Sequence, residues 1–224
     1  DADWMGAHLE RSHRELREAG LEVSSIKTGW CAMDNATMNG LRKLGIRAEL
    51  SGMPGQSYHP APDHDGYYFG SYDWSRTGQE MYRPSPADYQ AAAEEGGMWE
   101  IPISAGRSGW LSRAESMALA LRRRQWPQRP GGSRPVSFKL TFHPRLFRAL
   151  WQGFAAGLES LERPYFHAYF HPDELLPDLP APTRWIYSAD NARRNLEFLL
   201  ERLERAGYRS NFLTAEDLSR RLSP

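Results

Sequence analysis

The clearest pattern of apolar and polar positions lies at 190–206, where leucines recur at the spacing of one helix face. Asp190 is the expected N-cap of this helix, and Gly207 follows its expected end. The apolar stripe of the helix consists of Leu196, Leu199, Leu200 and Leu203. Weaker patterns predict further helices over Asp3 to just before Gly20, Asn35 to about Leu44, 114–124, 144–161 and the residues after Thr214.

Short apolar runs between these helices predict strands, the strongest being the aromatic run at 165–170. The predicted strands are 21–26, 46–50, 98–103, 136–142, 165–170 and 209–213. Helices and strands alternate with short turns over much of the chain, which is typical of a parallel α/β sheet or barrel. We therefore expect residues 1–224 to form a single α/β domain.

Residues 51–97 interrupt this alternation because they contain many Gly, Pro, Asp and His residues and have no sustained period. A loop of this length in a compact domain is usually functional or disordered. Its aromatic content argues against disorder, since disordered segments contain few aromatic residues. The segment is therefore expected to be an ordered excursion over one mouth of the fold. Its aromatic residues are Tyr58, Tyr67, Tyr68, Phe69, Tyr72, Trp74 and Tyr82.

Composition excludes several classes of protein. The chain has 224 residues, 40% of them hydrophobic and 25% charged, which is ordinary for a globular protein. Its 28 basic and 28 acidic residues give no net charge, and nucleic-acid binders normally carry a basic excess. No apolar stretch approaches the roughly 18 residues of a membrane span. A single cysteine, Cys31, and no visible signal peptide favour a cytoplasmic over a secreted protein.

Two histidines on the aromatic strand are candidates for chemistry. His171 lies where the predicted strand 165–170 ends, and ligands of parallel α/β folds bind at that end of the strands. Histidine suits acid–base work because it titrates near physiological pH. The alternative is a strand-end histidine that bonds to a neighbouring loop. His167 lies about 13 Å earlier on the strand, too far to share one metal ion, and is expected to pack or to line a substrate site.

A second candidate follows the predicted strand 21–26. Lys27 and Trp30 flank Gly29 in the next turn, and a cation beside an indole suits a polar, ring-shaped ligand. Aromatic faces also stack on sugar rings, so Tyr68 and Trp74 of the long loop indicate the same kind of ligand. The alternative is an ordinary turn with a core tryptophan. The long loop also groups the metal-capable donors His59, Asp63, His64 and Asp65.

The order of these pieces resembles the polysaccharide deacetylases, the NodB-like proteins of carbohydrate esterase family 4. Residues 25–30 and the "l-G-i-x-x-d-x-S" pattern at 44–51 are similar to the third-motif region of that family, with Lys27 in place of its arginine. Residues 82–85 and 99–103 look like the middle of a bacterial branch. Residues 170–175 resemble its last motif, and 212–218 its usual ending. The resemblance covers nearly the whole chain.

The resemblance implies a distorted (β/α) barrel, related to the TIM barrel, that removes an acyl group from a sugar with the help of zinc or another divalent metal. The family's Thr-Phe-Asp-Asp and His-x-x-x-His motifs are not in the sequence. The resemblance therefore implies a barrel that is incomplete on its N-terminal side, with metal ligands expected upstream of Asp1. His171 would protonate the leaving amine, and Lys27 would orient a carboxylate or steady developing charge. Trp30, Tyr68, Trp74 and His167 would contact a carbohydrate or glycoconjugate.

Two alternatives remain open at the level of the sequence. The first is a metal-less, non-catalytic carbohydrate-binding relative, or a subunit that a second copy or another chain completes. The lack of the two motifs favours this alternative, and the presence of His171 speaks against it. The second is an unrelated hydrolase that uses the His59, Asp63 and His64 cluster. A barrel that lacks its first strands would expose an unpaired sheet edge, so further polypeptide or a partner chain is expected.

Overall fold

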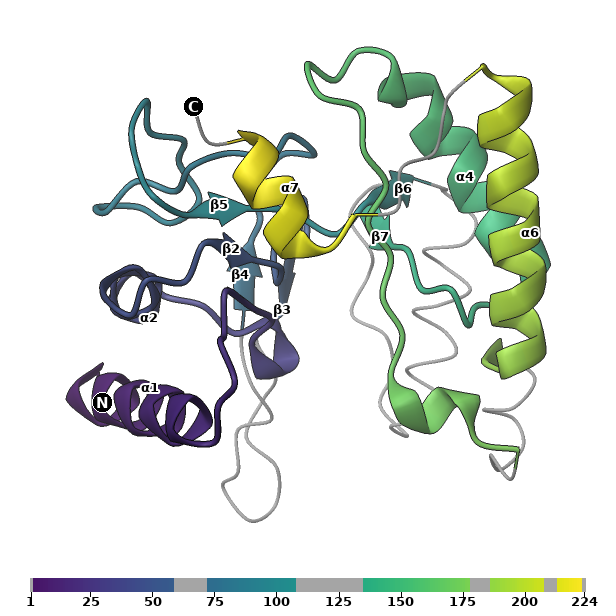
Figure 1. The fold of residues 1–224 in the computed structure, drawn as a ribbon. Coiled ribbons are helices and arrows are strands. Elements are labelled where there is room, and N and C mark those ends of the chain that lie inside the picture. Colours follow the sequence, from purple (N-terminus) through teal and green to yellow (C-terminus); the bar gives the residue numbers. More distant parts are fainter. Residues whose placement is uncertain (1, 59–71, 108–134, 178–185, 208–212, 223–224) are drawn as a thin grey trace. The chain divides into compact units, whose positions relative to one another are not determined.

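The computed structural model describes residues 2–58, 72–107, 135–177, 186–207 and 213–222. The chain divides into two compact units, and each is described by itself. Unit 1 contains Asp1–Pro102 and Leu213–Pro224, and unit 2 contains Ile103–Phe212. The described residues form helices and three small sheets, none of them closed into a barrel (Figure 1). The α/β class is confirmed in this form, whereas the barrel and the single domain stay predictions.

A three-stranded parallel sheet lies in unit 1. Its order is β1-β2-β5, and neighbouring strands pair in parallel in both contacts. The strands are shorter than the sequence predicted, because only part of each apolar run joins the ladder. They are β1 (Ser25–Ile26), β2 (Ala48–Glu49) and β5 (Trp99–Glu100).

The helices of unit 1 begin and end close to the predicted positions. Asp34 caps α2, since its carboxylate accepts a hydrogen bond from the backbone N–H of Thr37 at 2.7 Å. The hydroxyl of Thr214 accepts the N–H of Asp217 at 3.0 Å, and this capping contact lies at the predicted start of α7. Asp3 is not an N-cap, because the first helix already begins at Ala2. The helices are α1 (Ala2–Glu18), η1 (Gly29–Cys31), α2 (Asn35–Lys43) and α7 (Ala215–Leu222).

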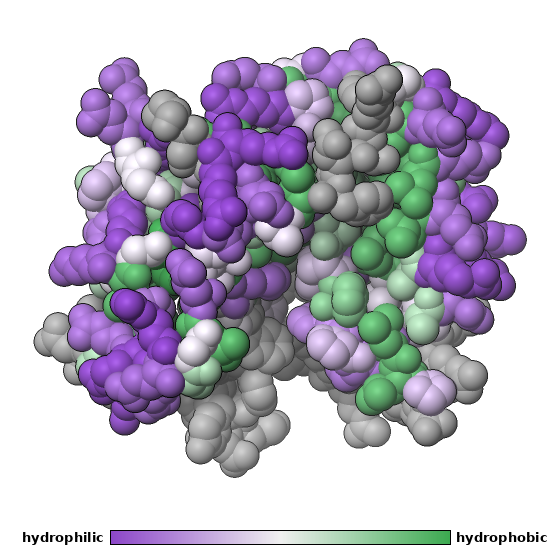
Figure 2. Space-filling view, viewed as in Figure 1, coloured by the Kyte–Doolittle hydropathy of each residue, from purple (hydrophilic) through white to green (hydrophobic). Residues whose placement is uncertain are grey.

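The outward faces of the long helices are mostly hydrophilic, as their amphipathic sequences predict (Figure 2). Leu16 of α1 and Leu196 of α6 (Ala189–Arg205) are exceptions, with 41% and 37% of their surface exposed. None of the helices in the described ranges is long and apolar enough to cross a membrane.

In its described residues, unit 2 combines a short antiparallel sheet with two long helices. Strands β6 (Ala105–Arg107) and β7 (Pro135–Ser137) pair with each other, and β6 packs on α4 (Pro144–Leu158). The approach is close at Gly106, where a side-chain carbon would collide with the backbone carbonyl of Leu150. Helix α6 packs on the same helix α4.

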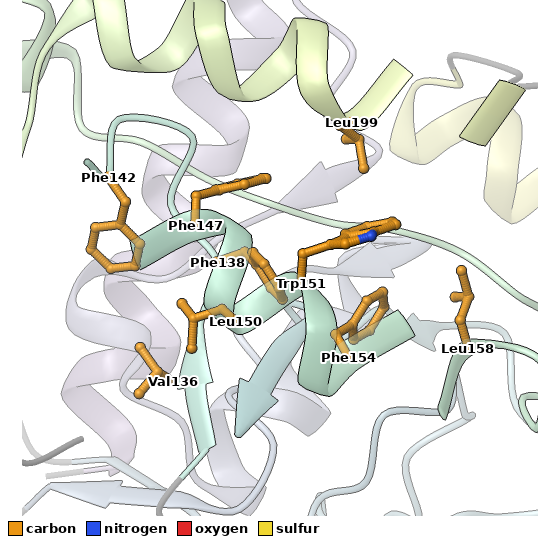
Figure 3. Close-up of a cluster of buried hydrophobic side chains, with 9 residues drawn as sticks. All are labelled: Val136, Phe138, Phe142, Phe147, Leu150, Trp151, Phe154, Leu158 and Leu199. Atoms are coloured by element: carbon orange, nitrogen blue, oxygen red, sulfur yellow. The ribbon is translucent and has the colours of Figure 1, made fainter. Parts of the chain in front are cut away.

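The hydrophobic core of unit 2 centres on Phe138. Its ring makes edge-on contacts with Phe147, Phe154 and Phe166 at centroid distances of 5.1 to 5.5 Å. Figure 3 shows how α4 and the strand β7 region supply most of this cluster, with Leu199 reaching it from α6. The buried members are Val136, Phe138, Phe142, Phe147, Leu150, Trp151, Phe154, Leu158 and Leu199.

Helix α6 differs from its prediction in two ways. Ser188, not Asp190, is the N-cap, because its hydroxyl accepts the N–H of Asn191 at 3.1 Å. Asn195 occupies the buried face, while Leu196 of the predicted stripe is exposed. The Asn195 amide donates to the carbonyls of Leu140 and Phe142, at 2.8 and 2.6 Å. These bonds satisfy backbone groups of the neighbouring segment, which a leucine could not do.

The predicted strand at 165–170 is wrong as a regular strand. Only Tyr169 forms a bridge, in parallel with Lys139. The N–H of Tyr169 donates to the carbonyl of Phe138 at 3.2 Å, and its carbonyl accepts from Leu140 at 3.0 Å. The segment 165–170 therefore forms one β-bridge, at Tyr169, and one further backbone hydrogen bond, from Ser104 to His167. The predicted helix at 114–124, the strand at 209–213 and the His59 cluster lie outside the described residues.

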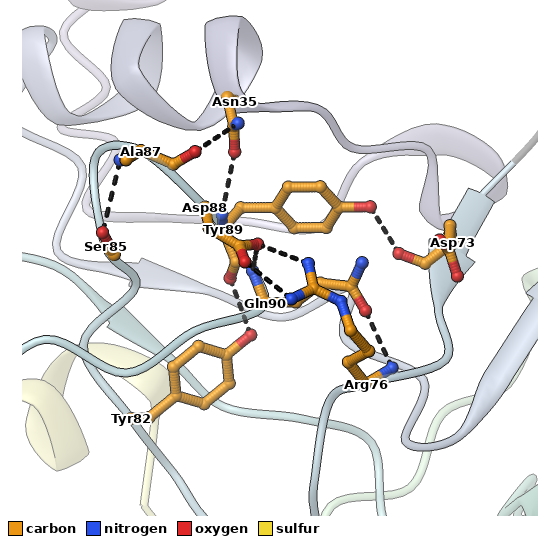
Figure 4. A network of polar contacts seen from close by, with 9 residues as sticks. All are labelled: Asn35, Asp73, Arg76, Tyr82, Ser85, Ala87, Asp88, Tyr89 and Gln90. Atoms are coloured by element: carbon orange, nitrogen blue, oxygen red, sulfur yellow. Dashed lines mark hydrogen bonds and ion pairs between the residues drawn. The ribbon is translucent and has the colours of Figure 1, made fainter.

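Ordered structure in the long loop is confirmed for its described part. Strands β3 (Gln56–Tyr58) and β4 (Tyr72–Trp74) form an antiparallel hairpin. After β4, the chain is fixed by polar contacts (Figure 4). The Asn35 carbonyl oxygen accepts the N–H of Tyr89 at 2.8 Å, and the Tyr89 hydroxyl donates to the carbonyl of Asp73. Burial raises the pKa of that hydroxyl to about 12. These bonds tie the loop to α2 and to the hairpin.

Candidate functional site

The carboxyl ends of three parallel strands lie side by side in unit 1. Lys27 directly follows β1, Glu49 ends β2, and Glu100 ends β5. In open parallel sheets this edge is where ligands bind, because the loops that follow the strands converge there. Lys27 was predicted at such a strand end, and the two glutamates were not identified from the sequence.

The turn after β1 is bonded to the turn after β2. The Thr28 N–H donates to the hydroxyl of Ser51 at 2.8 Å, and the two hydroxyls of these residues are also 2.8 Å apart. Lys27 is exposed, and its ammonium donates to Sγ of Cys31 at 3.2 Å. Cys31 is buried and has a φ of 56°, in the left-handed region that non-glycine residues seldom occupy.

Two buried carboxyl groups lie beneath this turn. Glu49 and Glu100 occupy paired positions of β2 and β5, and neither has any exposed surface. The N–H of Ser51 donates to Oε2 of Glu49, and the N–H of Gly52 donates to Oε1 of Glu100, both at 2.9 Å. Burial, together with the charge of Glu49 and a hydrogen bond to it, holds the pKa of Glu100 well above its usual range.

The sequence contained a signal for this acid pair. Each glutamate interrupts a short apolar run of a predicted strand, at Ile46–Leu50 and at Met98–Ile103. A charged residue in a strand of a parallel sheet is unusual, because such strands are buried on both faces.

Trp74 lies in the core of unit 1. Its side chain is fully buried, its indole N–H donates to the carbonyl of Cys31 at 2.8 Å, and its ring meets Tyr89 edge-on at 5.0 Å. Trp74 therefore supports the turn that contains Lys27. Its predicted contact with substrate stays a prediction. Trp30 belongs to η1, but its side chain and the whole of Tyr68 lie outside the described part of the chain.

His171 lies in unit 2, at the start of η2 (Pro172–Leu175). The residue is exposed, and its ring meets Tyr169 edge-on at 5.7 Å. Its N–H donates to Oε2 of Glu174 at 3.2 Å. Tyr169 pairs in parallel with Lys139 at an isolated bridge, and His171 lies two residues after it. The predicted role of His171 stays a prediction.

The carboxylate of Glu174 organises this region. Its Oε1 accepts from the ammonium of Lys139 at 2.6 Å, and its Oε2 accepts from the hydroxyl of Thr141 at 2.5 Å. The side chains of Lys139 and Glu174 are 13% and 8% exposed, so water screens this ion pair only weakly. The Lys139 ammonium also lies over the rings of Tyr169 and Tyr187, at 5.2 and 4.8 Å.

His167 is half-buried and bonded through its backbone. Its N–H donates to the hydroxyl of Ser104 at 3.0 Å, and its carbonyl accepts from the N–H of Ser104 at 2.9 Å. These two bonds fix the backbone of the segment 165–170 at His167. Unit 1 thus contains Lys27 and Trp74, and unit 2 contains His167 and His171.

A metal site was expected from the family resemblance. Over the ranges that the structure describes, no group of three or more His, Cys, Asp or Glu side chains could hold a metal ion. These residues therefore do not fit a zinc centre, and the ligands expected upstream of Asp1 stay a prediction. A scan against protein-family models and searches of curated proteins and of solved structures found no match. The functional interpretation therefore depends on the residues of this chain.

Proposed function

We propose that the protein is a hydrolase that removes an acyl group, in the first place N-acetyl, from a sugar or a sugar-containing substrate. The observation that carries the proposal is the parallel order of β1, β2 and β5, whose carboxyl ends place Lys27 next to the turn of Ser51. This edge is the usual ligand site of α/β enzymes. The order of motifs that resembles polysaccharide deacetylases supports the same function.

His171 is the proposed general acid. Amide hydrolysis requires a proton for the departing amine, and histidine supplies protons effectively near neutral pH. The residue meets two requirements of this role, because its side chain is exposed and its backbone is fixed by Glu174. His171 would lose its proton to the amine nitrogen as the carbon–nitrogen bond breaks.

Lys27 is the group that we propose stabilises the negative charge of the reacting carbonyl oxygen. Attack on an acyl carbon places negative charge on the carbonyl oxygen, and a nearby ammonium stabilises that charge. Compared with the family's arginine, a lysine keeps the positive charge but loses the planar pair of donors. The metal that the resemblance implies has no ligand set among the described residues, so we derive no step through it.

A non-catalytic carbohydrate-binding protein is the second candidate. It is favoured by one observation, the lack of a group of metal-capable side chains in the described ranges. In this alternative, Lys27 and the aromatic residues bind a sugar that is released unchanged. A second copy or another chain could then complete the sheet edge at β1.

Acetate release from N-acetylated chito-oligosaccharides tests the two candidates. The assay uses the native protein after its intact mass and bound-metal content have been measured. For the hydrolase we expect acetate and free amine in equal amounts, and a loss of about 100-fold or more in His171→Ala, as for other general acids. His8→Ala is the matched control, since His8 is also exposed but lies on α1.

Sugar binding distinguishes the outcomes. Under the hydrolase proposal, calorimetry with the same oligosaccharide should show that His171→Ala retains binding within a few-fold. Binding without acetate release, in the presence of added zinc, would overturn the hydrolase and support the second candidate. If neither binding nor release occurs, both proposals fail.

A further inference from the structure

Glu49 and Glu100 form a buried pair of carboxyl groups in unit 1, and the contacts around them do not supply enough hydrogen-bond donors for two carboxylates. Both side chains are fully buried at paired positions of neighbouring strands. Each has one oxygen bonded to a backbone N–H, that of Ser51 or of Gly52. The second oxygens, Oε1 of Glu49 and Oε2 of Glu100, are buried, and no N–H or O–H group of the described residues donates to them.

Such an arrangement is unfavourable when both groups are charged. A buried ionised carboxylate without a compensating bond costs several kcal/mol, and two like charges side by side add their repulsion. A buried oxygen that lacks a partner also calls for a donor. A single proton satisfies both requirements, because it removes one charge and joins the two free oxygens.

We propose that Glu49 and Glu100 form a proton-binding site, in which one proton is shared between Oε1 of Glu49 and Oε2 of Glu100. The pair then carries one negative charge, stabilised by the N–H groups of Ser51 and Gly52. No bond other than the O–H bond forms or breaks. The inference goes beyond the proposed reaction and does not depend on it.

The groups around the pair support the bound proton. Cys31 of η1 further raises the pKa of Glu100, and Tyr82, which bridges to Glu100, has its own pKa raised by burial and by Glu100. Three basic side chains of the surrounding segments have contacts with groups outside the acid pair. Lys27 contacts Cys31, Arg47 pairs with Glu216, and Arg83 stacks on Trp99.

The proton also fixes the turn above the pair. The two N–H donors belong to consecutive residues of the turn after β2, and Ser51 bonds through its hydroxyl to the turn that carries Lys27. Loss of the proton would place two negative charges against these backbone groups. The acid pair therefore couples the pH to the order of the candidate site in unit 1.

Infrared spectroscopy of protein labelled with ¹³C at the glutamate carboxyls tests the proposal directly. A protonated carboxyl has a carbonyl stretch that a carboxylate lacks, and the label separates it from aspartate. At neutral pH we expect this band in the native protein, with an intensity of about one carboxyl, because the pair holds one proton. Its frequency should shift in D₂O.

Two isosteric variants locate the proton. In Glu100→Gln and in Glu49→Gln the amide donates to the remaining carboxylate, so the band should vanish in both. Glu201→Gln removes an exposed glutamate that pairs with Arg205, and this control should retain the full band. Either glutamine variant is enough to test the proton-binding site, so the test can still be made if one of the two variants does not fold.

Three results would overturn the proposal. The band could be missing from the native protein at neutral pH, it could persist undiminished in both glutamine variants, or it could appear only after dialysis against a chelator. The last result would show that a cation, and not a proton, lies between the carboxyls.

Discussion

The two units bury carboxyl groups in opposite ways. In unit 1, Glu49 and Glu100 face each other as two acids, and backbone N–H groups supply their bonds. In unit 2, Glu174 faces the base Lys139 and also accepts from Thr141 and His171. The difference shows that burial alone does not fix the state of a carboxyl group. The neighbouring charge determines whether the group keeps its proton or pairs as an ion.

The largest expected loss of stability is in unit 2, for the substitution Lys139→Met. Lys139→Met keeps the volume of the side chain but leaves Glu174 as a buried charge without a base. Breaking a buried ion pair in this way costs about 3–5 kcal/mol. We expect hydrogen exchange in α4 and α6 to accelerate accordingly. Lys43→Met is the control, because Lys43 is exposed in the last turn of α2. Equal exchange in both variants would contradict the account.

A smaller effect is expected for Gly52→Ala in unit 1. The added carbon would collide with Oε1 of Glu100 and lie 3.3 Å from Cα of Pro102. Overpacking of this kind costs about 1–3 kcal/mol. Gly40→Ala is the matched control in a helix of the same unit, where the nearest atom is 3.8 Å away. That control should gain about 0.5–1 kcal/mol. Denaturant unfolding that gives both variants the same sign would contradict the packing.

Ser51→Ala should have the smallest effect. It removes the acceptor of the Thr28 N–H and one hydroxyl contact, at a cost of about 1 kcal/mol. The bond from the Ser51 N–H to Glu49 remains. Local exchange at Thr28 should therefore rise while exchange at β5 stays unchanged. Ser85→Ala removes an exposed loop contact and is the control. Faster exchange throughout the parallel sheet would show that the hydroxyl has a wider role.

The sequence predicted those elements whose signals are local. Helix α2 begins at Asn35 and α7 begins directly after Thr214, as predicted, and both starts depend on capping contacts within one turn. The predictions were wrong where contacts with residues distant in the sequence determine the local structure. Asn195 lies on the buried face of α6 because the carbonyls of Leu140 and Phe142 need donors. The strand predicted at 165–170 pairs only at Tyr169, since strand length depends on a partner and not on aromatic content.

The candidate sites were predicted in part for the same reason. Lys27 and His171 were predicted because each follows an apolar run, and Lys27 does follow strand β1, whereas only an isolated bridge at Tyr169 precedes His171. Glu49 and Glu100 are recognisable as a pair only when β2 and β5 are known to be neighbours, and the order of the strands along the chain does not reveal this. The same holds for Lys139 and Glu174, which are 35 positions apart.

The difference between the acid pair of unit 1 and the ion pair of unit 2 is tested most directly by hydrogen exchange. The exchange is measured in both units at several pH values and corrected for the intrinsic exchange rate. The pKa of Glu100 is raised above the usual 4.5, so native unit 1 holds a proton that the unfolded chain loses. Its stability is complete below pH 4.5 and falls as the pH rises toward the raised pKa. The opening constant for exchange at β5 should therefore rise up to tenfold per pH unit. Exchange in α4 should lack this slope, because the buried Glu174 of unit 2 faces the base Lys139 and not a second acid. Parallel pH profiles in β5 and α4 would contradict the account.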